Sequence, residues 1–250
     1  EHLTELRNRL LKSALAVAVG MVIGFLVYQP VMAELYRPIK ELSEQGYTAA
    51  IAYDTVASPF DIMLKISMFV GLILSSPVWL YEAWAFLAPG LTTKEKRISL
   101  LFVAASVPLF LAGCWFGYMT LPKAIQFLLG ITPDGAANLP EADMYFKFVT
   151  RFILAFGIAF LLPVFLVGLN TAGVLPARVM IKGWRVAVMV IFVFAALMSP
   201  SPDAWSMLAL AFPMVGLFYL ACAISAILDR RKKKERPQWL DVPDDHASTM

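Results

Sequence analysis

Six stretches of the chain are almost wholly apolar, and polar segments separate them. A helix needs about 20 mostly apolar residues to cross the hydrocarbon core of a bilayer. The stretches run from Ser13 to Val31, Phe60 to Leu87, Ile98 to Leu121, Phe148 to Thr171, Trp184 to Met198 and Trp205 to Leu228. The fifth is short, and the Ser-Pro-Ser-Pro run after it predicts a tight turn, because proline fixes φ and lacks an N–H. This pattern predicts an all-α integral membrane protein with six transmembrane helices, forming a concave bundle with short spans five and six.

Two segments next to the predicted spans have apolar residues at helical spacing. After the first span these are Leu35, Ile39 and Leu42, which predict an amphipathic helix on the membrane surface. A similar spacing of Leu121, Ile125 and Leu128 predicts another such helix at the end of the third span. Within the last span, Pro213 and Gly216 predict a kink.

Composition and charge agree with this interpretation. Hydrophobic residues make up 60% of the chain and charged residues 16%, and the mean hydropathy is +0.71. Segments 1–12, 88–97, 173–185 and 229–250 carry fifteen Lys and Arg, whereas the segments on the opposite side carry four. The positive-inside rule therefore predicts that both termini are cytoplasmic. We expect one membrane domain over residues 1–228 and a basic, disordered cytoplasmic tail over 229–250.

The sequence lacks the residues that catalysis inside a membrane requires. The two histidines, His2 and His246, lie at the ends of the chain, which excludes a serine–histidine site or a histidine-ligated metal within the bilayer. Asp61 and Glu82 are about 30 Å apart if they share one straight helix, so they cannot form a catalytic pair. We expect no enzyme activity, no metal and no cofactor. The net charge of +3 gives no reason to expect a nucleic-acid partner.

A small-solute or ion-coupled transporter is the alternative function for six spans. Such proteins place ionisable residues near the middle of the membrane, but here charges gather at span ends. Asp61 and Lys65 have the spacing of a local ion pair, and Arg151 can extend its head group toward the interface. Cys114 and Cys222 lie in apolar stretches and are expected to serve packing.

Four polar or mixed stretches are more specific. They are HLTELRNRL at 2–10, VASPF at 56–60 followed by LILSSPV at 72–78, WAFLAPGL at 84–91 followed by EKR at 95–97, and SPD at 201–203. In this order and topology they resemble the TatC family, and the resemblance extends from His2 to about Leu228.

TatC is the polytopic receptor subunit of the twin-arginine protein translocase in the prokaryotic inner membrane. The resemblance implies that twin-arginine signal peptides of folded cargo proteins bind at the cytoplasmic face. It further implies export with single-span TatA/TatB-type partner subunits, driven by the proton-motive force, and a homo-oligomeric receptor complex within the lipid bilayer.

The resemblance also implies a signal-peptide site, and its chemistry is reasonable. Two adjacent guanidinium groups favour carboxylates that accept forked hydrogen bonds. The matching residues are Glu5 and Glu95 for the arginines, Phe86 and Pro89 for the apolar flank of the signal, and Arg7 and Arg9 beside them.

Each of these positions has a simpler explanation as well. Glu5 and Arg9 are spaced as an i,i+4 helical pair, which contributes only a few tenths of a kcal/mol. Glu95 can pair with either neighbouring lysine, and orienting the first span would account for Arg7 and Arg9. Glu82 lies one helical turn before the apolar part of the site, where lining the site and a structural role are equally reasonable.

The last spans suggest how partners dock. A 15-residue helix covers about 22 Å, less than the roughly 30 Å hydrocarbon core, so the face of spans five and six is expected to dock a partner helix and thin the bilayer. Some family members have an acidic or amide residue where this chain has Leu161, and a polar one where it has Met207. Asp203 remains polar and can either contact a partner or cap the turn.

Overall fold

The computed structural model describes residues 2–44, 51–87, 93–131, 139–171, 173–199 and 204–234. These residues form ten helices: α1 (His2–Leu26), α2 (Tyr28–Glu44), α3 (Ser58–Leu74), α4 (Ser76–Leu87), α5 (Thr93–Gly130), α6 (Ala142–Phe160), α7 (Leu162–Thr171), α8 (Ala177–Lys182), α9 (Trp184–Met198) and α10 (Ala204–Lys234). Within these ranges the β-structure is one isolated bridge between Ala52 and Glu141. The predicted all-α class is therefore confirmed.

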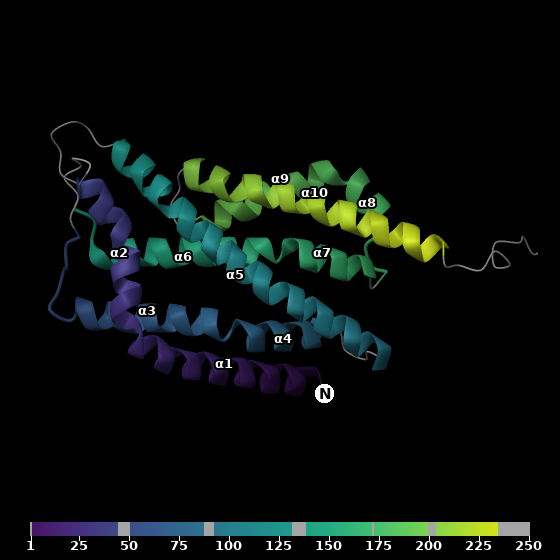
Figure 1. Ribbon diagram of the computed structural model, residues 1–250, viewed down its shortest axis with the longest axis horizontal. Coiled ribbons are helices and arrows are strands. Elements are labelled where there is room, and N and C mark those ends of the chain that lie inside the picture. The colour runs from purple at the N-terminus through teal and green to yellow at the C-terminus, as the bar shows by residue number, and fades with distance from the viewer. Residues whose placement is uncertain are drawn as a thin grey trace, which may run out of the picture.

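The long helices lie along one direction, and α2 crosses them at one end (Figure 1). The beginning of α1, the end of α4, the turn after α7 and the end of α10 lie toward the opposite end of the bundle (Figure 1). Hereafter the end with α2 is called the outer end, and the end with the start of α1 is called the inner end.

In the part of the chain that the structure describes, four helical segments are long and apolar enough to cross a membrane: Thr4–Leu26, Leu101–Gly130, Ala142–Thr171 and Ala204–Arg230. The predicted second span is a pair of helices, α3 and α4, bent by 60°. The predicted fifth span is α9, which has 15 residues and is shorter than the others. Every predicted span thus corresponds to helix, but the second is a bent pair, the fourth consists of α6 and α7, and the fifth is short.

The bend between α3 and α4 follows from Pro77. Proline cannot donate to the carbonyl four residues earlier, and its ring clashes with that carbonyl. Helix α3 therefore ends at Leu74, and the N–H of the next residue, Ser75, still donates to the Gly71 carbonyl at 2.9 Å. The indole of Trp79 donates to the Leu72 carbonyl at 3.0 Å. The indole thus satisfies a carbonyl that the break leaves free.

Glycines allow the closest helix contacts. On α1, a Cβ at Gly20 would lie 2.7 Å from the carbonyl oxygen of Gly71 on α3, and a Cβ at Gly24 would lie 2.5 Å from that of Ser67. Close approach of this kind is a common way to pack helices in lipid, where association depends on van der Waals contact. These contacts fix α1 against the helix pair α3–α4.

The structure corrects the predicted location of the first amphipathic helix. The helix exists as α2, but Leu35 and Ile39 are 4% and 1% exposed and belong to the protein core. The hydroxyl of Tyr145 on α6 donates to the Leu35 carbonyl at 2.9 Å. The apolar face therefore packs on the bundle rather than on the membrane surface. The side chain of Leu42 lies outside the described part of the structure.

The third and last spans are longer than expected. Helix α5 continues through Leu121 and Pro122, so the second amphipathic helix is an extension of the span and not a separate element. Helix α10 passes Pro213 without a break and ends at Lys234, beyond the expected domain boundary at 228. The beginning of the predicted tail is therefore helical, and residues 235–250 lie outside the described residues.

Polar contacts hold both ends of the bundle. At the outer end Lys65 on α3 pairs with Asp61, as predicted, and also with Asp143 on α6 at 2.6 Å. At the inner end the Asp229 carboxylate accepts hydrogen bonds from the Asn170 amide at 3.1 Å and from the Ala177 N–H at 3.0 Å. The second contact satisfies a donor in the first turn of α8.

Candidate functional site

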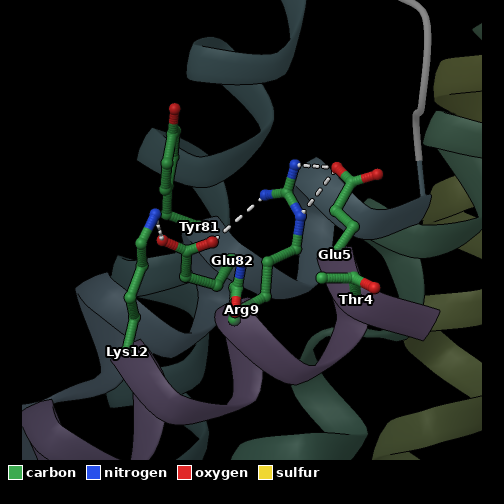
Figure 2. Close-up of a pocket in the computed structure, with 7 residues that line it drawn as sticks. Thr4, Glu5, Arg9, Lys12, Tyr81 and Glu82 are labelled. Carbon is green, nitrogen blue, oxygen red and sulfur yellow. Dashed lines mark hydrogen bonds and ion pairs between the residues drawn. The ribbon is translucent and has the colours of Figure 1, made fainter. Parts of the chain in front are cut away.

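A cavity of about 650 Å³ lies at the inner end, between α1 and α4. Figure 2 shows the side chains around it. Seven residues line the cavity: Thr4, Glu5, Asn8, Arg9, Lys12, Tyr81 and Glu82. Five come from α1 and two from α4, so residues about 70 positions apart in the sequence share one polar surface.

Helical periodicity places these side chains on one surface. Residues three or four positions apart occupy the same face of a helix, which brings Glu5, Asn8, Arg9 and Lys12 onto the α1 face that meets α4. On α4, Glu82 points toward this face (Figure 2). The bend at Pro77 sets the direction of α4 and therefore the position of Glu82.

The guanidinium of Arg9 bridges two carboxylates from different helices. Its Nη2 and Nε donate to Oε1 of Glu5 at 2.6 and 3.1 Å, and its Nη1 donates to Oε2 of Glu82 at 3.1 Å (Figure 2). The Lys12 ammonium lies 3.7 Å from the other oxygen of Glu82. Two carboxylates and two cations thus form a cluster with no formal net charge.

The two carboxylates differ in exposure. The side chain of Glu82 is 10% exposed, whereas that of Glu5 is 42% exposed; Arg9 lies between them at 22%. A nearly buried carboxylate must keep a counter-charge, because an unpaired charge away from water is strongly destabilising. Glu82 is therefore the nearly buried carboxylate of the cavity and must stay paired, whereas Glu5 is the carboxylate that solvent can reach.

The structure brings together only part of the predicted signal site. Glu5 and Arg9 line the cavity, and Phe86 lies one turn beyond Glu82 on α4 with 38% of its surface exposed. Arg7 is exposed and is not among the lining residues. Pro89 lies outside the described residues, as does the side chain of Glu95, which belongs to the first turn of α5.

The cavity also contains residues that sequence reasoning left open or did not consider. Glu82 was equally consistent with a structural role, yet it contacts Arg9 directly. Lys12 and Tyr81 were not proposed as site residues. The i,i+3 spacing of Lys12 from Arg9 was the available signal on α1, whereas no local pattern connects α1 with α4.

The positions considered for partner docking lie elsewhere. Leu161 lies between α6 and α7 and lines an apolar cavity of about 140 Å³ with Trp79 and Trp84. Met207 lies near the start of α10 and packs against the core. Asp203 lies outside the described residues. These observations leave the docking role a prediction.

The described residues contain no group of three or more His, Cys, Asp or Glu that could hold a metal ion. Cys114 and Cys222 are buried free thiols, in line with the packing role expected of them. The chemistry that the cavity supports is recognition of a cation by carboxylates. Arg9 shows the geometry, because the cavity already holds one guanidinium in this way.

Comparisons with known proteins agree with this interpretation. Residues 1–213 match the model of the family described as Sec-independent protein translocase protein (TatC). Relatives named Sec-independent protein translocase protein TatC include one from Xylanimonas cellulosilytica, 42% identical over 92% of this chain and 84% of its own length. Another, from Aquifex aeolicus, is 34% identical over 94% of this chain and 97% of its own length.

A solved structure extends the similarity to three dimensions. The crystal structure of the twin arginine translocase receptor TatC in DDM has a TM-score of 0.78 and 33% identity, covering 90% of this chain and 99% of that one. The alternative of a small-solute transporter receives no support from any of these matches. This chain belongs to the TatC family of Sec-independent protein translocase proteins.

Proposed function

We propose that this protein is the receptor subunit of a twin-arginine translocase and that it binds paired-arginine signal peptides in the cavity between α1 and α4. One observation carries the proposal: carboxylates from two helices bind a guanidinium group at the inner end. Arginine is always ionised and presents a planar fork that suits carboxylates. Glu5 and Glu95 contact the signal arginines in this proposal, with Phe86 and Pro89 beside the apolar flank and Arg7 and Arg9 nearby.

The proposed topology has six spans with both termini in the cytoplasm. Four long helical segments, the bent pair α3–α4 and the short α9 make up the six. The start of α1 and the end of α10 lie toward the same end of the bundle (Figure 1), as an even number of spans requires. The fifteen Lys and Arg of the inner segments support a cytoplasmic location for that end.

The proposed partners follow from the same membership. Single-span TatA/TatB-type subunits and further copies of this chain assemble with it in the bacterial inner membrane, and the proton-motive force drives export of folded cargo. The short α9 supports a docking and membrane-thinning role for the α9–α10 face, with Asp203, Leu161 and Met207 as the positions to test.

Site-specific crosslinking to a synthetic paired-arginine signal peptide tests the receptor function. Replacing Glu5 and Glu95 together by glutamine should abolish crosslinks to residues 1–12 and 84–97 while the protein still inserts in the membrane, because both acceptor charges are lost. Glu34→Gln is the matched control, since Glu34 is an exposed carboxylate on α2 at the outer end. Wild-type crosslinking by the double variant would refute the site.

A further inference from the structure

Arg9 occupies the kind of position that a signal arginine requires. Its Nε and Nη2 bind Glu5 and its Nη1 binds Glu82, so the accessible carboxylate of the cavity already has a guanidinium partner from its own chain. A signal arginine that binds Glu5 must compete with Arg9 for the same acceptor. What happens to Arg9 then decides how strongly the signal binds.

Exposure indicates which carboxylate Arg9 keeps. Glu82 has 10% of its side chain exposed and Glu5 has 42%. If Arg9 left Glu82, a nearly buried carboxylate would lose its hydrogen-bonded counter-charge, which is the more costly loss. If Arg9 released Glu5, water could hydrate the exposed carboxylate or a signal arginine could bind it.

Resting on the function proposed above, we propose that Glu82 is a positioning residue. It keeps Arg9 bound when a signal peptide arrives, so that Arg9 can release Glu5 to a signal arginine. Lys12 cannot take this role from Arg9. Its side chain is 67% exposed, and its ammonium lies 3.7 Å from Glu82 and lacks the guanidinium fork. Without Glu82, Arg9 has Glu5 as its described carboxylate partner, and the cluster gains a net positive charge that repels the signal.

The test measures binding of a fluorescent peptide, carrying paired arginines followed by an apolar segment, to the full chain in lipid nanodiscs. Glu82→Gln should weaken binding by roughly tenfold, the amount expected for one charge-assisted hydrogen bond. Adding Arg9→Gln to Glu82→Gln should restore the affinity to within about twofold of wild type. The second substitution restores it because Arg9 no longer competes for Glu5 and the excess positive charge is removed as well.

Restored binding in the double variant distinguishes the positioning role of Glu82 from direct contact with the signal and from a purely structural role. If the double variant binds as weakly as Glu82→Gln, then Glu82 contacts the signal or maintains the fold, and the inference is wrong. It is also wrong if Glu82→Gln alone binds like wild type. Should Glu82→Gln fail to fold, Arg9→Lys replaces it in the test, because lysine keeps a counter-charge for Glu82 but lacks the fork that also binds Glu5. Arg9→Lys should bind at least as tightly as wild type, and a loss of tenfold or more would overturn the inference.

A separate measurement with Glu5→Gln tests the function on which the inference rests. Loss of peptide binding in Glu5→Gln, together with failed suppression by Arg9→Gln, would leave the receptor site standing and refute only the role of Glu82. Unchanged binding in Glu5→Gln would refute the receptor site itself. A paired-lysine version of the peptide should bind more weakly to every variant, because lysine lacks the forked donors.

Discussion

Replacing Gly20 by alanine should destabilise the protein by forcing α1 away from α3. The added Cβ would lie 2.7 Å from the Gly71 carbonyl oxygen and 2.9 Å from its Cα. Both are backbone atoms and cannot rotate aside, so the helices must separate by roughly 1 Å to reach an ordinary contact of about 3.5–4.0 Å. Overpacking of this kind costs about 1–3 kcal/mol.

The chain offers a matched control for this substitution. Alanine is favoured over glycine inside a helix by about 1 kcal/mol, and this gain offsets part of the clash at Gly20. Gly216 lies within α10, and a Cβ there would meet no atom within 4 Å. Gly216→Ala should therefore keep the gain without the clash. The difference in unfolding free energy between the two variants should be about 1–3 kcal/mol.

Thermal unfolding of both variants in the same detergent, followed by circular dichroism, measures this difference. Gly20→Ala should unfold at a lower temperature than wild type or close to it, and Gly216→Ala at an equal or higher temperature. If Gly20→Ala is as stable as Gly216→Ala, the close backbone contact between α1 and α3 does not limit their packing, and the reasoning fails.

Three further predictions concern the two ends of the bundle and its short helix. Asp229→Ala should lower the unfolding free energy by about 1–3 kcal/mol, because the Asn170 amide and a first-turn N–H of α8 lose their acceptor; an unchanged unfolding temperature would contradict this. Lys65→Met should lower the unfolding temperature only slightly, and less as salt is raised, because the ion pair of Lys65 with Asp143 that joins α3 to α6 is partly exposed. Arg37→Met is the control, because the described ion pairs of Arg37 lie within α2. A loss of stability in Lys65→Met that does not change with salt would argue against a stabilising ion pair between α3 and α6. Lengthening α9 by five apolar residues should reduce export of a paired-arginine reporter protein, since the mismatch with the bilayer disappears; full export by the lengthened variant would refute a role for the short span.

The sequence by itself determined what depends on local pattern. Apolar length located helix at every predicted span, and i,i+4 spacing anticipated the ion pairs of Glu5 with Arg9 and of Asp61 with Lys65. Helical periodicity also identified α2. These features could be predicted because hydrogen bonding in a helix and contacts one turn apart depend on neighbouring residues alone.

Only the tertiary structure decided which surfaces meet. The apolar face of α2 suits a membrane surface or a protein core equally well, and packing against α3 and α5, with a hydrogen bond from Tyr145 on α6, placed it in the core. Glu82 joined Arg9 because the bend at Pro77 and the glycine contacts of α1 bring two distant segments together. Periodicity tells which residues share one face of a helix, but the neighbour of that face is set by contacts between residues far apart in the chain.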